Sequence, residues 1–280
     1  MLAALAGRRH IESATPDLFK LADDADANER SAALAALGST IAVGDLPVLI
    51  ARAVDPGKPD EAQVALVALR IACGRMPDRD AATAHLVKAL GTVQVPAKCK
   101  LIDVLVPLGG DKALKVVADA AKDANGDVRR AAYKALGQWT STGAGPVLLD
   151  LVKRGDPELK IGATRAYNRI ARQFSIPNDR RMAMFREIMA LAQRDDERRL
   201  ALDILKQIRT AEALSVAVGY LDQPALGDAA ARVAVTMSGK MVDPADAEAV
   251  AAAMRRVLRT TKDKEVINKA REMLNRAGKK

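Results

Sequence analysis

The side chains that most often carry catalysis or bind metals are scarce in this sequence. Histidine occurs only at His10 and His85, and neither has another histidine, a cysteine or a carboxylate at metal-ligand spacing. The densest acidic cluster, Asp195 to Glu197, directly precedes a predicted helix, where carboxylates match the positive end of the helix dipole. The sequence therefore predicts no catalytic residue, no metal site and no cofactor.

The cysteines and one glycine-rich segment support the same interpretation. Cys73 and Cys99 lie 26 residues apart within helical patterns and form no CxxC pair, which indicates buried, inert thiols. Residues 137–145 contain three glycines, but they lack the Lys-Ser/Thr pair of a phosphate-binding loop and a preceding strand. No motif of the sequence predicts an enzyme.

What remains for function is positive charge. The net charge is +9, and residues 141–280 carry 26 Lys and Arg against 18 Asp and Glu, whereas residues 1–140 carry 18 against 17. Residues 126–139 combine two arginines, a lysine, a tyrosine and the only tryptophan. This mixture is found in nucleic-acid-binding segments, in active sites and in structural repeats. The secondary structure around residues 126–139 decides among these three roles.

The composition predicts an all-α chain. Hydrophobic residues make up 49% of the sequence but aromatic residues only 2%, so the apolar fraction is chiefly alanine, leucine and valine, which favour helices over strands. No apolar run is long enough to span a membrane, and residues 1–9 lack the charge order of a signal peptide. We expect no membrane contact, and a cytoplasmic location unless the chain is a piece of an exported protein.

A repeated frame runs through the chain. Val128 to Gly137 aligns with Glu29 to Gly38, since a basic residue, two alanines, a leucine and a glycine coincide. Proline or aspartate marks the start of a helix ahead of several copies. The frame predicts eight antiparallel helix pairs, and its column of small or apolar residues consists of Ala33, Ala65, Leu101, Ala132, Ala163, Ala201, Ala230 and Ala270.

The predicted repeats fill one domain, residues 1–280. Residues 1–13 are similar to the end of a second helix, which predicts that they are the remnant of a preceding repeat and that the chain is a piece of a longer protein. The approximate repeats are 14–43, 44–76, 77–109, 110–142, 143–175, 176–209, 210–241 and 242–280.

The pattern resembles the HEAT repeat family, which is armadillo-like, through the Asp127-Val128-Arg129 signature that begins a second helix. The resemblance implies an α-α superhelix, or solenoid, that acts as a soluble, non-catalytic scaffold for protein–protein interaction. Leu101 replaces the alanine of the third repeat and Gly227 the basic residue of the seventh, so stacking there is less regular. The later repeats are also similar to HEAT regions of large bacterial proteins with sugar-processing or haem domains, which implies an accessory region as one alternative.

In such a solenoid the second helices line the concave binding side. Positions two before, two after and six after the alanine column point away from the core, and we call them the outer positions. They are small or apolar in the first three repeats and basic in later ones. We expect a surface that binds an acidic protein or a neighbouring domain, or else a merely solvated one; its candidate residues are Arg130, Lys134, Arg165, Arg169, Arg172, Arg199 and Arg232.

Two further predictions concern the basic residues. A nucleic-acid adaptor using the same surface is the alternative function, although aromatic stacking platforms are few and Trp139 lacks the nearby carboxylate of a HEAT-like DNA glycosylase. A second basic column recurs three residues before the alanine column. We expect it to form a structural ladder between repeats; its members are Arg30, Lys98, Arg129, Lys160 and Arg198.

Overall fold

The computed structural model describes residues 2–55 and 57–277. Its regular elements are α-helices and three short 3₁₀ helices, and the described residues include no strand. By contacts the chain divides into an N-terminal part, residues 1–147, and a C-terminal part, residues 148–280. Each part is described by itself, and a single domain over residues 1–280 stays a prediction.

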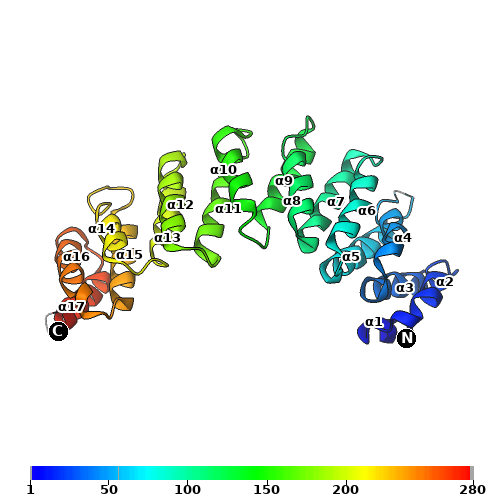
Figure 1. The fold of residues 1–280 in the computed structure, drawn as a ribbon, viewed down its shortest axis with the longest axis horizontal. Helices are drawn as coiled ribbons and strands as arrows, with labels where there is room; N and C mark the ends of the chain where they lie inside the picture. Colours follow the sequence, from blue (N-terminus) through cyan, green and yellow to red (C-terminus); the bar gives the residue numbers. More distant parts are fainter. Residues whose placement is uncertain (1, 56, 278–280) are drawn as a thin grey trace. The chain divides into compact units, whose positions relative to one another are not determined.

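The N-terminal part consists of a short helix followed by four helix pairs (Figure 1). The first helices of the pairs are α2, α4, α6 and α8, and the second helices are α3, α5, α7 and α9. Their bounds are α1 (Leu2–Arg8), α2 (Thr15–Leu21), α3 (Ala27–Thr40), α4 (Leu46–Ala53), α5 (Pro59–Arg75), α6 (Arg79–Leu90), α7 (Val95–Leu108), α8 (Asp111–Ala120) and α9 (Gly126–Gly137).

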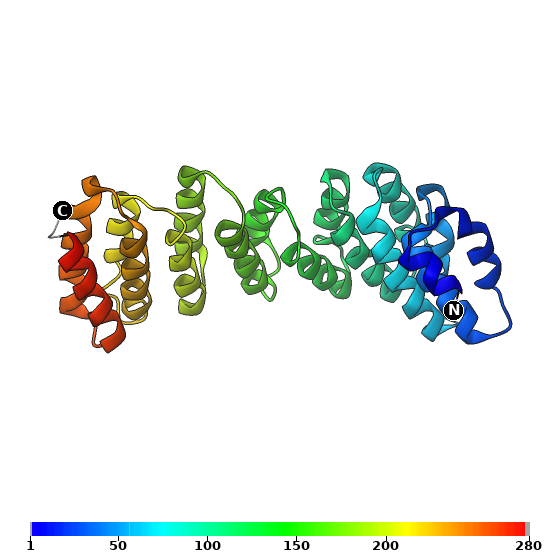
Figure 2. The same ribbon diagram turned by 90° about the horizontal axis from the view of Figure 1, so that it is seen from below.

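The C-terminal part consists of four more pairs, whose first helix α10 begins just before the division (Figure 2). Each of the eight pairs falls within one predicted repeat range. The bounds are α10 (Ala144–Arg154), α11 (Lys160–Gln173), α12 (Asn178–Leu191), α13 (Asp195–Leu205), α14 (Ala211–Val218), α15 (Gly227–Lys240), α16 (Ala247–Thr260) and α17 (Lys264–Ala277).

Local signals account for the helix starts. The side chains of Asp26, Asp78, Asn125 and Thr210 each accept a hydrogen bond from a main-chain N–H of the helix that follows, which satisfies a donor that the helix itself leaves unpaired. Proline occupies the first turn of α2, α4, α5 and α7, where its missing N–H costs nothing.

Within each part the second helices pack in succession. α1 packs on α3, and α3, α5, α7 and α9 follow one another; α11, α13, α15 and α17 do the same. Every member of the predicted alanine column is at most 1% exposed, which confirms that it is the core frame. A Cβ on Gly38 would lie 2.8 Å from the Ala68 carbonyl oxygen, so α3 and α5 approach backbone to backbone.

The α1 helix takes the place of a second helix. A Cβ on Gly7 would lie 2.9 Å from the Cα of Ala36, the same close approach that Gly38 makes to the next second helix. By this equivalence Ala4 and Arg8 of α1 correspond to the outer positions Ala35 and Ser39 of α3.

Candidate functional site

The residues with the greatest intrinsic reactivity do not form a site. His10 is exposed and His85 is half-buried, and no three His, Cys, Asp or Glu residues of the described chain gather closely enough to hold a metal ion. Burial raises the pKa of the Cys73 thiol to about 12, and burial with nearby aspartates raises that of Cys99, so both thiols stay protonated near neutral pH. Neither cysteine has the depressed pKa of a nucleophile.

The acidic cluster before α13 has the role of a helix terminus. Asp195 pairs with Arg198 at 2.9 Å and Asp196 with Arg199 at 2.6 Å, both within the first turn. Glu197 is 1% exposed and accepts a hydrogen bond from the Gln193 N–H. The three carboxylates thus lie at the positive end of the helix dipole, as expected, but none of them caps the helix.

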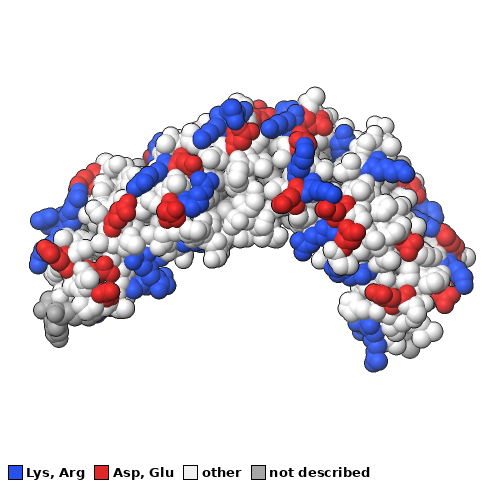
Figure 3. All heavy atoms as spheres, viewed as in Figure 1, with Lys and Arg blue, Asp and Glu red and all other residues white. Residues whose placement is uncertain are grey.

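Charged side chains of both signs lie intermixed over the face of each part that Figure 3 shows. No helix among the described residues is long and apolar enough to cross a membrane. Because the charges are mixed, a binding surface is found by identifying which basic residues already have partners within the protein.

The column predicted as a ladder forms two kinds of contact. Arg30, Arg129 and Arg198 each donate to main-chain carbonyl oxygens just before their own helix, at 2.8 to 3.0 Å. Lys160 likewise reaches a carbonyl of its own repeat at 3.4 Å. Arg30 and Lys98 pair with a carboxylate of the next repeat, at 2.8 and 3.9 Å. The column is structural, and its contacts lie both within a repeat and between repeats.

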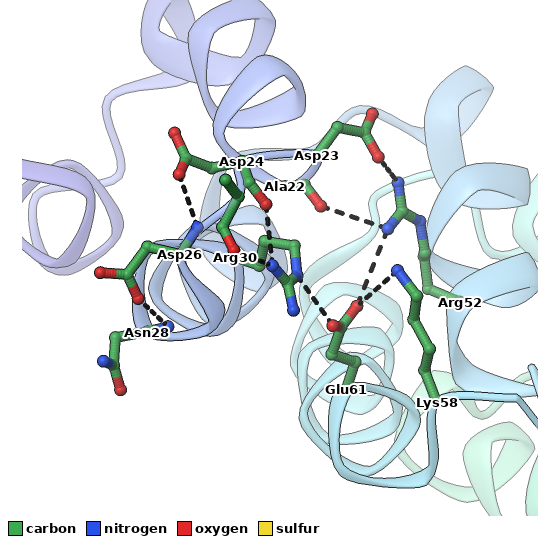
Figure 4. A network of polar contacts seen from close by, with 10 residues as sticks. Ala22, Asp23, Asp24, Asp26, Asn28, Arg30, Arg52, Lys58 and Glu61 are labelled. Atoms are coloured by element: carbon green, nitrogen blue, oxygen red, sulfur yellow. Dashed lines mark hydrogen bonds and ion pairs between the residues drawn. The ribbon is translucent and has the colours of Figure 1, made fainter.

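The Arg30 contact is part of a network centred on Glu61, shown in Figure 4. The side chain of Glu61 is 11% exposed and accepts from Arg30 Nε at 2.8 Å, while Lys58 and Arg52 lie 3.7 and 4.0 Å from its other oxygen. Arg52 also donates to the Ala22 carbonyl at 3.2 Å. The network joins four helices of the first two pairs, so these cations stabilise the fold. The repeat pattern does not predict this network, because Glu61 is one of many carboxylates in the first turn of a helix.

A further set of arginines caps helix C-termini. Arg75 donates to the Gly38 carbonyl at 3.1 Å, and Arg181 donates to the Ala171 carbonyl at 2.9 Å. Arg276 makes the corresponding contacts at the end of α15. A carbonyl neutralises no formal charge, so residues of this kind contribute to the net charge of +9 without being free to bind a partner.

Three of the seven predicted binding residues are engaged by carboxylates. Arg130 pairs with Asp127, three residues earlier in α9. Arg199 pairs with Asp196 and donates to a loop carbonyl at 2.8 Å, and Arg232 pairs with Asp263 at 3.2 Å. These pairs are partly exposed and weak, but they lower the local positive potential.

Of the other four residues, three contribute charge that no carboxylate pair offsets. Lys134, Arg165 and Arg172 form no hydrogen bond or ion pair with any described residue. Arg169 lies with its guanidinium carbon 5.4 Å from the centre of the Phe174 ring, and burial lowers its pKa. Lys134 belongs to the N-terminal part, whereas the three arginines all lie on α11.

The charge of α11 sets it apart from the other second helices. Its sequence includes Lys160, Arg165, Arg169 and Arg172 but no Asp or Glu. Tyr167 of α11 is 1% exposed, and its hydroxyl donates a hydrogen bond to Glu187 of α12. This bond fixes the buried side of α11 against α12. We call Arg165, Arg169 and Arg172 the α11 basic face.

The aromatic residues Tyr133, Trp139 and Tyr167 contribute no binding platform near these cations. Tyr133, Trp139 and Tyr167 are all at most 7% exposed. Trp139, just after α9, is the packing residue that the repeat predicted.

Residues 77–168 match the protein family described as HEAT repeats. No curated protein matches the chain.

Several solved structures are similar to the chain at low identity. Kap121p bound to Ste12p is 14% identical with a TM-score of 0.49, covering 93% of this chain and 32% of that chain. The Escherichia coli YibA structure is 19% identical with a TM-score of 0.44, covering 93% and 92%. Human deoxyhypusine hydroxylase in complex with glycerol is 16% identical with a TM-score of 0.37, covering 87% and 99%.

The chain spans about a third of the length of the Kap121p chains. The family match, the helix pairs and the buried alanine column agree with one another. Residues 77–168 are similar to HEAT repeats, and the helices on both sides of them are paired in the same way, as in an α-solenoid.

Proposed function

We propose that the chain is a non-catalytic scaffold that binds an acidic segment of a protein partner, or of a neighbouring domain, through the α11 basic face. HEAT repeats are typically protein-binding and usually non-catalytic. The observation that carries the proposal is that α11 has four cations and no carboxylate, and that Arg165 and Arg172 have no partner among the described residues.

The energetics favour this face over the other predicted residues. A charged hydrogen bond to an unpaired arginine contributes about 1.5–3 kcal/mol. A partner that binds Arg130, Arg199 or Arg232 must compete with an aspartate that already lowers the positive potential there. Arg169 is already fixed against Phe174, so it loses little side-chain entropy when a carboxylate binds.

Nucleic acid is the second candidate, because phosphates are attracted to the same cations. Binding of single-stranded nucleic acid without sequence preference relies on exposed aromatic rings for stacking. Tyr133, Trp139 and Tyr167 are buried, which argues against nucleic acid as the partner. A carboxylate-rich protein segment needs no such rings, and we favour it for that reason.

Fluorescence anisotropy with two labelled probes tests the proposal: a glutamate-rich peptide and a single-stranded DNA. Replacing Arg165 and Arg172 with glutamate should weaken peptide binding by about tenfold or more, which corresponds to about 1.4 kcal/mol. The matched control replaces Arg255 and Arg259 of α16, which are exposed on a first helix of the same part, with glutamate. It makes the same change in net charge.

An equal loss of binding in both variants would mean that only net charge matters, and the α11 site would be rejected. DNA that binds more tightly than the peptide, with a steep dependence on salt, would select the nucleic-acid candidate instead.

A further inference from the structure

A second surface, chemically unlike α11, lies on the N-terminal part. Two of the three outer positions of α5 are Val67 and Ile71, which are 48% and 47% exposed. Ala35, at an outer position of the adjacent helix α3, is exposed as well. Three second-helix residues on neighbouring helices thus present apolar side chains to solvent.

This apolar surface continues into a cavity between α1 and α3. The cavity has a volume of about 320 Å³, at the lower end of the range for ligand pockets. Small residues line its floor, among them Ala4, Gly7, Ala32 and Ala35. The cavity is large enough to accept an aliphatic side chain from a partner.

An arginine and a histidine lie at the rim of the cavity. Arg8 is exposed and has no acidic partner among the described residues. His10 adopts a left-handed backbone conformation, with a φ of 51°, which ends α1 and places its ring next to the end of α3. Its Nδ1 lies 3.3 Å from the Ser39 carbonyl oxygen, which can only accept, so Nδ1 donates and the other ring nitrogen remains for a ligand.

Negative charge is nearly absent from the same surface. Among the described outer positions of α1, α3, α5 and α7, the one carboxylate is Asp103, and it is already paired with Arg70. An acidic group of a partner therefore meets a cation at the α1 end and no repulsion along the rest of the surface.

We infer that the outer positions of α1 to α5 form a docking site for an extended, apolar segment of a partner protein that carries a carboxylate at the end next to Arg8. An aliphatic side chain of the segment fills the α1–α3 cavity, and further ones pack on Val67 and Ile71. We call this surface the apolar strip; its outer residues are Ala4, Arg8, Ala35, Ser39, Val67 and Ile71.

The length of the segment follows from helix packing. Neighbouring helices lie about 8–10 Å apart, so crossing from α1 over α3 to α5 takes about 16–20 Å. An extended chain advances about 3.3 Å per residue, which gives a segment of about six residues. Alternate side chains of such a segment face the helices, so we expect apolar residues at every second position.

A synthetic peptide supplies the test. The probe is a fluorescein-labelled peptide of about ten residues in which leucine and serine alternate after a pair of glutamates, and binding is measured by anisotropy. We expect V67S/I71S to weaken binding by about tenfold or more, and Ala35→Arg, which fills the cavity mouth, to do the same. All three positions are exposed, so the variants should fold.

The control uses valines of similar exposure on first helices. Val48 of α4 and Val87 of α6 are 39% and 45% exposed, and V48S/V87S should leave binding unchanged. The peptide with lysine in place of glutamate should bind more weakly, because it meets Arg8 with like charge. The R165E/R172E variant of α11 should bind the probe as the unaltered protein does, which separates this inference from the proposed function.

Several results would overturn the inference. They are an unaltered protein that fails to bind the probe, equal losses in V67S/I71S and V48S/V87S, or a probe that is lost only when α11 is changed. Sedimentation that reveals a dimer abolished by V67S/I71S would assign the strip to a second copy of the chain instead.

Discussion

Replacing Gly38 with alanine tests the close packing of second helices on which the fold depends. Gly38 lies near the end of α3, and a Cβ there would stand 2.8 Å from the carbonyl oxygen and 2.9 Å from the Cα of Ala68 in α5. Ordinary van der Waals contact begins at 3.4 Å, so the two helices must separate by about 0.6 Å. Both contacted atoms are main chain and cannot rotate away.

The expected change in the free energy of unfolding is the difference between two contributions. Overpacking against a rigid neighbour costs about 3 kcal/mol at the upper end of the usual range, and alanine gains about 1 kcal/mol over glycine inside a helix. We expect Gly38→Ala to lower the free energy of unfolding by about 2 kcal/mol. The assay is urea unfolding followed by the fluorescence of Trp139, which is buried in the same part of the chain and becomes exposed on unfolding.

Gly162 of α11 is the matched control. It is exposed, and a Cβ there meets nothing within 4 Å, so Gly162→Ala should raise stability by about 0.5–1 kcal/mol. The same substitution is thus expected to act with opposite sign at the two positions. A Gly38→Ala protein as stable as the unaltered one would refute the backbone-to-backbone approach of α3 and α5.

Two further predictions concern buried ionisable groups. Replacing Glu61 with alanine should lower the free energy of unfolding by about 2 kcal/mol, because it leaves Arg30 without its carboxylate partner. In urea unfolding, R30A/E61A should lower it by less than the sum of the two single changes. Strictly additive changes would contradict the network. Burial raises the pKa of Cys73 from 9.0 to about 12, so the unfolded chain loses its thiol proton first as pH rises. The stability difference between the unaltered protein and Cys73→Ala should therefore be full below about pH 9 and shrink toward about pH 12, and a pH-independent difference would show that the thiol is not buried in this way.

The fold was predictable because its determinants are periodic. An alanine such as Ala132 or Ala163 recurs in seven of the eight repeats, with Leu101 in the third, and all of these positions are buried as expected. The order of the second helices follows from the same column. Leu101 and Gly227 depart from the repeat frame, yet helix pairs form at both positions.

The candidate site was less predictable because a sequence pattern does not reveal which charges are already paired. Arg130 and Arg165 both occupy outer positions of second helices, yet Arg130 pairs with Asp127 and Arg165 pairs with no described residue. The difference is local, since α9 has an aspartate in its first turn and α11 has none. The cavity between α1 and α3 could not be read from the sequence at all, because it depends on how closely two helices approach.

The measurement that tests the central claim most directly is site-specific crosslinking from the α11 basic face. A photoreactive amino acid replaces Arg165 in one protein and Arg255, on the first helix α16, in the other, and the crosslinked products are identified by mass spectrometry. We predict that position 165 captures carboxylate-rich protein segments and that position 255 does not. Crosslinks to nucleic acid, or the same products from both positions, would contradict the account.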